Sequence, residues 1–199
     1  MGLESIEKKV SNYLTIVNGH WAQRYDVHEQ VEGSVTRKLE KGDNAGQTVR
    51  ERYYRSVTGV MEEIKLAEKP WGSIDLEITL KLIDVEGSPC YTLVIPSNNR
   101  LFYDFAKRVP NIDCTPEITT QIGIGSDKDN GKTRLFLYMK QNGEKVPMHY
   151  TKDNPDGMPE PVERKGKGWD YSEREDWLYT KLEEFVQKFN DGVDEEIPF

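Results

Sequence analysis

The chain has 199 residues, which is long enough to bury a core without disulfides or a structural metal. Its composition, 36% hydrophobic and 31% charged, is typical of a soluble globular protein, and no stretch approaches the roughly 18 apolar residues of a membrane span. The net charge of −8 is uneven: residues 169–199 hold three basic and ten acidic side chains, a net of −7, which leaves −1 for residues 1–168 and does not exclude a nucleic-acid partner.

The start of the chain and its cysteines indicate the compartment. The first residues have neither the basic start nor the apolar run of a signal peptide, so we expect a cytoplasmic protein. Cys90 and Cys114 lie on or near predicted strands and have no metal-site spacing, so we expect both to be reduced core residues.

Alternation of apolar and polar residues predicts that residues 1–145 form one domain, mainly of strands. The clearest strand is 74–82, and the others are 13–17, 21–27, 47–61, 91–95, 118–124 and 133–140. Between them lie dipeptides that end in glycine and are typical of tight hairpin turns, namely Asn18-Gly19, Glu86-Gly87, Asn130-Gly131 and Asn142-Gly143. Residues 100–109 have helical spacing and stop at Pro110. About seven strands and one short helix predict an antiparallel barrel like the OB-fold.

The rest of the chain is predicted to be a loop, a helix and a tail. Residues 146–170 are rich in proline and glycine and predict a loop. Residues 171–190 predict an amphipathic helix that begins with a Ser172–Glu175 capping box. Its apolar stripe could pack on the barrel or form a homodimer, and is made of Leu178, Leu182, Phe185, Val186 and Phe189. Residues 191–199 predict a disordered acidic tail.

The tail ends in acids followed by an apolar tip, Asp194, Glu195, Glu196, Ile197, Pro198 and Phe199. A partner can bury the Phe199 ring while a basic group binds its carboxylate, and the acids would steer the tip to a basic rim. This tip resembles that of bacterial single-stranded DNA-binding proteins (SSB). The predicted architecture is similar to that of divergent bacteriophage SSB proteins, with an OB-fold, a C-terminal helix and an acidic tail ending in Phe.

The resemblance implies a non-enzymatic protein without a cofactor that binds single-stranded DNA in replication, recombination and repair. Its tip would recruit proteins of the polymerase, helicase, primase or nuclease class, in the host cytoplasm if the chain is phage-encoded. No membrane partner is expected.

A surface that binds single strands without sequence preference needs exposed aromatic faces and basic groups. In the strand 133–140, one face carries Arg134, Phe136, Tyr138 and Lys140, with Leu135, Leu137 and Met139 predicted to face the core. A second predicted patch holds Arg50, Arg52 and Tyr54. Further stacking candidates are Trp21, Tyr25 and Trp71, and residues 38–47 predict a hairpin tip that could close over a strand.

Two other functions are open. The chain could be an adaptor or decoy that carries the tip without binding DNA, in which case Phe136 and Tyr138 should be buried. It could also be a metal-dependent nuclease that uses Asp75 and Glu77, although solvated carboxylates on the polar face of a strand are the default expectation. The sequence shows no nucleophile motif and no metal-ligand spacing around its three histidines, so neither a catalytic nor a metal site is predicted.

Overall fold

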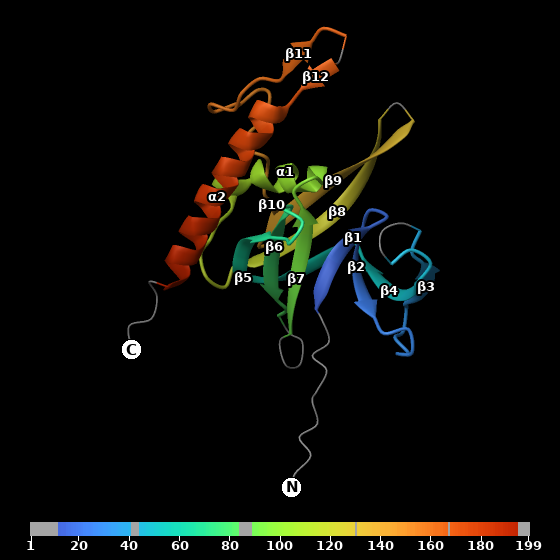
Figure 1. The fold of residues 1–199 in the computed structure, drawn as a ribbon. Helices are drawn as coiled ribbons and strands as arrows, with labels where there is room; N and C mark the ends of the chain where they lie inside the picture. Colours follow the sequence, from blue (N-terminus) through green and yellow to red (C-terminus); the bar gives the residue numbers. More distant parts are fainter. Residues whose placement is uncertain (1–11, 41–43, 84–88, 130, 167, 195–199) are drawn as a thin grey trace.

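The computed structural model describes residues 12–40, 44–83, 89–129, 131–166 and 168–194. These form a mainly β structure with one ten-stranded sheet, a small hairpin and two α-helices (Figure 1). The strands of the large sheet are β1 (Tyr13–Val17), β2 (His20–Tyr25), β3 (Val35–Lys38), β4 (Thr48–Tyr54), β5 (Ser56–Glu68), β6 (Ile74–Lys81), β7 (Cys90–Pro96), β8 (Thr119–Asp129), β9 (Lys132–Gln141) and β10 (Glu144–Lys145).

The strand order is β10-β9-β8-β5-β6-β7-β1-β2-β4-β3. Neighbours are antiparallel, as predicted, with the exception of β1 and β7, which run parallel. The prediction of a wholly antiparallel sheet is therefore wrong at this pair. β1 and β7 are separated by five other strands in the sequence, so no hairpin connects them, and the antiparallel direction that a hairpin imposes is not required.

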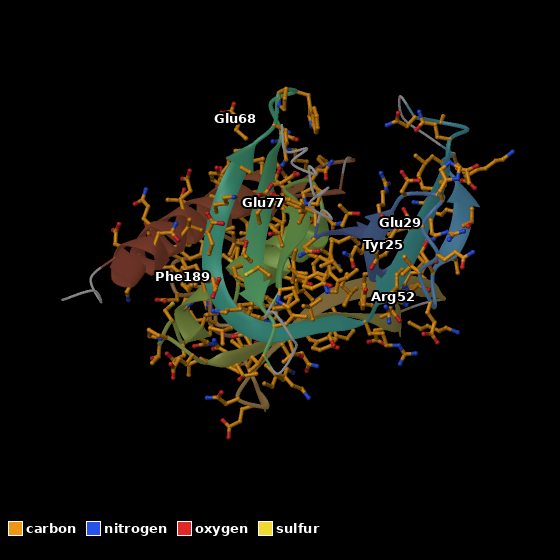
Figure 2. All side chains as sticks on the ribbon, turned by 90° about the horizontal axis from the view of Figure 1, so that it is seen from below. Tyr25, Glu29, Arg52, Glu68, Glu77 and Phe189 are labelled. Atoms are coloured by element: carbon orange, nitrogen blue, oxygen red, sulfur yellow. The ribbon has the colours of Figure 1, made fainter. Side chains whose placement is uncertain are left out.

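The predicted strand over residues 47–61 is two strands, β4 and β5, separated by a bend at Arg55. β4 pairs with β2 and β3, whereas β5 pairs with β6 and β8 and follows a curved path (Figure 2). Tyr54 and Val57 both pack on the core although they are three residues apart, so the alternation shifts by one residue at the bend. The change of partner strands explains why one stretch of β pattern forms two elements.

Two predicted hairpin turns have the expected backbone. Asn18 and Gly19 join β1 to β2 with φ values of 50° and 78°, and Asn142 and Gly143 join β9 to β10 with 48° and 85°. Positive φ at both central residues is what a type I′ turn requires. Gly131, with φ of 77°, follows β8, while Asn130 and the predicted turn at residues 86–87 lie outside the described residues.

Helix α1 (Arg100–Ala106) begins as predicted but ends three residues earlier, and a 3₁₀ turn at Val109–Asn111 follows it. Pro110 lies inside that turn and does not directly end the α-helix. Asp104 of α1 is 1% exposed and its Oδ2 accepts a hydrogen bond of 3.1 Å from the Leu137 backbone N–H of β9. The helix thus covers part of the β9 edge that β10 leaves unpaired.

Helix α2 (Ser172–Asp194) carries the predicted apolar stripe, and all five of its members are buried. The stripe packs within the chain, against α1 and β5, and the Asn190 side chain donates to the Ile64 carbonyl oxygen at 3.1 Å. The helix continues four residues beyond its predicted end. No described helix combines the length and the apolar character needed to cross a bilayer.

The predicted capping box at the start of α2 is wrong. The Ser172 hydroxyl donates to Asp170 Oδ1 at 2.8 Å, and the same oxygen accepts the Ser172 backbone N–H at 3.1 Å. Glu175 N–H instead bonds the Tyr171 carbonyl oxygen at 2.9 Å. Asp170 therefore caps this helix, because an aspartate two residues upstream reaches the first free N–H.

The predicted loop over residues 146–170 is only partly irregular. It contains a hairpin of β11 (Val162–Arg164) and β12 (Gly168–Asp170) and brings Val146, Tyr150 and Met158 into the core. The cysteine prediction also needs correction: both thiols are free, but Cys114 is exposed and Cys90 is half-buried.

Candidate nucleic-acid interface

The predicted row on β9 forms a continuous surface, which we call the outer row: Arg134, Phe136, Tyr138 and Lys140. Leu137 and Met139 are fully buried on the opposite face, while Phe136 is 37% exposed and Arg134 and Lys140 are exposed. β8 pairs with β5 only over its first residues, so beyond Gly123 it pairs with β9 alone, and the two strands leave the sheet as a ribbon (Figure 1). Phe136 therefore lies on an accessible surface, and Tyr138 beside it is half-buried.

Two glycines on β8 determine how the two aromatic rings lie. Gly123 is directly opposite Tyr138, and Gly125 is directly opposite Phe136. A Cβ atom at either glycine would overlap the ring of its partner, so each ring lies across the neighbouring strand, over backbone that has no side chain. The two rings thus occupy the space that side chains on β8 would otherwise fill. The alternation of isoleucine and glycine in β8 was the sequence signal for this arrangement.

Within the described residues, the two basic side chains of the outer row differ in their cross-strand neighbours, since Asp127 of β8 is directly opposite Arg134 and no acid is directly opposite Lys140. Arg134 and Lys140 form no ion pair there, and Lys140 is directly opposite Lys145 of β10. Like charges directly across two strands destabilise a sheet unless an anion compensates them. Lys145 could not be assigned from sequence, because β10 is only two residues long.

The second predicted patch faces the other side of the sheet. Arg50, Arg52 and Tyr54 share the face of Trp21, which belongs to the core, whereas the outer row points away from the core. The two patches therefore do not form one surface by register. Figure 2 shows Tyr25 and Arg52 together at the end of the sheet formed by β2 and β4.

The aromatic groups of this second patch are already held by protein contacts. The hydroxyls of Tyr25 and Tyr54 donate to Gln23 Oε1 at 2.5 and 3.2 Å, and the Arg52 guanidinium lies 5.4 Å from the centre of the Tyr54 ring. Burial, together with the hydrogen bond to Tyr54, raises the pKa of Tyr25. Arg50 donates to the Glu29 carbonyl oxygen. These side chains stabilise the patch and leave less of it free for a ligand.

On the opposite face of β4, the buried carboxylate of Glu51 joins three strands. Arg24 of β2 donates to its Oε1 at 3.1 Å, Arg37 of β3 to its Oε2 at 2.7 Å, and the Tyr53 hydroxyl to the same Oε2 at 2.9 Å. Burial alone would raise the pKa of Glu51, but the hydrogen bonds from Arg37, Tyr53 and Arg24 outweigh it and lower the pKa. β3 and β4 pair as a hairpin that is attached through this carboxylate, while residues 41–43 of the hairpin tip predicted over 38–47 lie outside the described residues.

The two tryptophan candidates lie apart from the outer row. Trp21 has no exposed surface and is removed from the set of stacking residues, because the strand face it shares with Tyr25 turns into the core. Trp71 is 76% exposed, but it lies at the turn between β5 and β6, at the opposite end of β5 from β8.

The carboxylates considered for a nuclease are neither solvated nor free. Asp75 and Glu77 are 8% and 5% exposed, and Lys69 Nζ lies 3.5 Å from Asp75 Oδ2 and 2.9 Å from Glu77 Oε1. The described residues contain no group of three or more His, Cys, Asp or Glu side chains placed to hold a metal ion. The expectation of solvated carboxylates is therefore corrected to a buried ion-pair cluster.

The predicted recruitment tip lies almost wholly outside the described residues, since only Asp194, the last residue of α2, is included. Comparison of the chain with protein-family models, with curated proteins and with solved structures found no match.

Proposed function

We propose that this protein binds single-stranded DNA without sequence preference, as a non-enzymatic coat for exposed strands in replication, recombination and repair. The observation that carries the proposal is the outer row, in which two aromatic rings lie over Gly123 and Gly125, between two basic side chains that form no close ion pair within the described residues. Flat rings accept any base, because every base has a π-face, and the cations bind the phosphates that all sequences share.

The magnitudes set a limit on what the outer row can do. Stacking contributes about 1 to 3 kcal/mol per base, so two rings supply roughly 2 to 6 kcal/mol. A dissociation constant of 1 μM corresponds to about 8 kcal/mol. Phosphate contacts must therefore supply the rest, and binding should weaken steeply as salt is added.

We propose further that the strands form an OB-like barrel. If β4 and β5 are counted as one bent strand, the ladders run from β1 to β2, to β4 and β5, to β6, to β7 and back to β1. Contact between β2 and β8 beside the bend supports this interpretation. The outer row would then lie on the outside of the barrel, on the ribbon that projects from it.

The acidic tip, residues 194–199, completes the proposal as a docking peptide for replication and repair proteins. Its likeness to the SSB tip supports this role, and the predicted architecture supports a bacteriophage type of SSB. An adaptor without DNA binding would bury Phe136 and Tyr138, which does not fit the 37% exposure of Phe136.

The test is fluorescence-polarisation binding of labelled oligo-dT to the full chain and to a Phe136→Ala, Tyr138→Ala double variant. We expect salt-sensitive binding by the full chain and a loss of about 30-fold or more in the double variant. Tyr13→Ala, which removes an exposed ring from β1, is the matched control and should bind normally. If the full chain ignores oligo-dT at low salt, the proposal is wrong.

A further inference from the structure

A basic groove lies where the first turn of α2 meets α1 and β9. It is a cavity of about 560 Å³ lined by Arg100 and Lys107 from α1 and its C-terminal end, Arg134 from β9, and Arg174 and Tyr171 from the start of α2. Glu175 is the one acid among the described residues that line it. The local charge is thus strongly positive in a chain whose net charge is −8.

The cations of the basic groove repel one another. Arg100, Lys107 and Arg134 form no ion pair within the described part of the chain, and the Arg174 Nε–H donates to a neutral acceptor, the Pro159 carbonyl oxygen, at 3.0 Å. Burial lowers the pKa of Lys107, and the neighbouring charges of Arg174 and Arg108 lower it further, against the opposing effects of Asp104 and Glu175. An anion in the groove would relieve this repulsion.

Two features indicate an extended anion that also carries bases. Arg134 belongs both to the outer row and to the basic groove, so the two surfaces are continuous. A second cavity of about 360 Å³ shares Tyr171 and Arg174 with the groove and includes Trp169 of β12. Tyr171 and Trp169 are 45% and 57% exposed, so both rings are accessible to a base.

We propose that the basic groove binds the sugar-phosphate backbone of the same single strand after it leaves the outer row at Arg134, with a base stacked on Trp169. Arg100, Lys107 and Arg174 would hold successive phosphates. This inference rests on the proposed function and deepens it, because it assigns the phosphate contacts that stacking alone does not supply. It also assigns a role to the hairpin of β11 and β12.

The test compares two oligonucleotides, one that is too short to reach the basic groove and one that is long enough. The outer row spans about 20 Å along β9, so oligo-dT of roughly 6 nucleotides covers it, whereas roughly 16 nucleotides extends past Arg134. The variants are Lys107→Gln and Arg100→Gln. The matched control is Lys188→Gln, which removes one exposed charge 14 residues further along α2 than Arg174, or about 21 Å away.

We expect each groove variant to bind the long oligonucleotide about threefold to tenfold more weakly and to reduce its salt slope by about 0.7, the effect of one lost phosphate contact. The groove variants should bind the short oligonucleotide as tightly as the full chain does, and Lys188→Gln should change the binding of neither oligonucleotide. Trp169→Ala should weaken binding of the long strand alone, with its salt slope kept. Because Arg100 is exposed, its variant keeps the test informative if the half-buried Lys107 cannot be replaced without loss of folding, which thermal melting would report.

Two results would overturn the inference and leave the proposed function standing. One is that both groove variants bind the long strand as Lys188→Gln does, while the Phe136, Tyr138 double variant still loses binding. The other is that the groove variants weaken binding of the short and the long oligonucleotide by the same factor, which would show that their effect does not depend on a strand that reaches the groove. Absence of any binding by the full chain would instead reject the proposed function itself.

Discussion

At the scale of single residues, the glycines of β8 matter as much as the aromatic side chains of β9. Stacking requires a ring with an accessible face, and a ring can extend over the neighbouring strand only where no side chain there is in its path. Gly123 and Gly125 meet that need at two successive positions on one face, opposite Tyr138 and Phe136. Neither glycine has a positive φ, so backbone conformation alone does not require glycine at these positions.

The first prediction follows from this geometry and concerns Gly125→Ala. The new methyl group would displace the Phe136 ring, whose outer atoms can move because they are the free end of a side chain. We expect affinity for oligo-dT to fall by about fivefold to tenfold, part of the stacking contribution of one base, with the melting temperature changed by only a few degrees. Polarisation binding and thermal melting measured on the same sample check both effects.

Gly125→Ala combined with Phe136→Ala gives the control. Once the ring is absent the methyl group has nothing to displace, so the double variant should bind as Phe136→Ala does. If the loss of affinity in the double variant equals the sum of the losses in the two single variants, Gly125 acts in some other way.

At the scale of elements, the sequence predicted what short-range patterns determine. Alternation located most of the large sheet and the buried face of β9, and helical spacing located α2 and its stripe. The short strands β3, β10, β11 and β12 were missed, because two to four residues carry too little pattern. The parallel pairing of β1 with β7 and the burial of Trp21 depend on contacts between distant segments, which no local pattern contains.

The same limit applies to the candidate site. The outer row was predicted in full, since it lies within one strand. The groove combines Arg100 and Lys107, from α1 and its C-terminal end, with Arg174 of α2, an element far away in sequence, and the packing of α1 against α2 brings them together. The strand pattern predicted that Asp75 and Glu77 are solvated. It does not contain Lys69, which binds both carboxylates only because the turn between β5 and β6 reverses the chain.

The second prediction concerns the junction of β2, β3 and β4. Glu51→Gln keeps the volume but removes the charge that Arg24, Arg37 and Tyr53 bind. We expect a loss of about 1 to 2 kcal/mol in the free energy of unfolding at pH 7, in the lower part of the range for charged hydrogen bonds because the Arg24 side chain is half exposed and screened by water. Urea denaturation measures the difference.

The pH dependence gives this prediction its sign. The pKa of Glu51 is lower in the folded chain than its ordinary value of 4.5, so the charged carboxylate stabilises the fold above that value. The stabilisation is lost as pH falls through the folded-state pKa, and the gap between the native chain and Glu51→Gln should close in acid. Glu62→Gln, an exposed carboxylate on β5, should stay within about 0.5 kcal/mol at both pH values. A gap that stays constant with pH would mean that the carboxylate is not charged in the fold.

At the scale of the whole molecule, charge is separated along the chain. The basic side chains of the outer row and the groove gather around β9, α1 and the first turn of α2, whereas four of the acids lie in the last nine residues. Figure 1 shows that the two ends of α2 point to opposite sides of the domain, with the groove end beside the β11–β12 hairpin. A negatively charged segment tethered to a domain with a positive groove is present at an effective concentration on the order of millimolar.

This separation leads to the last prediction, that the acidic tail competes with DNA. Deleting residues 191–199 would be a poor test, because α2 extends to Asp194 and would lose its last four residues. Glu195→Gln with Glu196→Gln leaves the helix intact and changes the net charge from −8 to −6. We expect this variant to bind oligo-dT more tightly at low salt, with the difference vanishing near 1 M salt, where the screening length is only about 3 Å. Glu183→Gln with Glu184→Gln makes the same charge change on the exposed side of α2. If the tail competes for the DNA surface, the tail variant alone tightens binding; if both pairs tighten it equally, the effect is one of net charge, and the tail has no competing role.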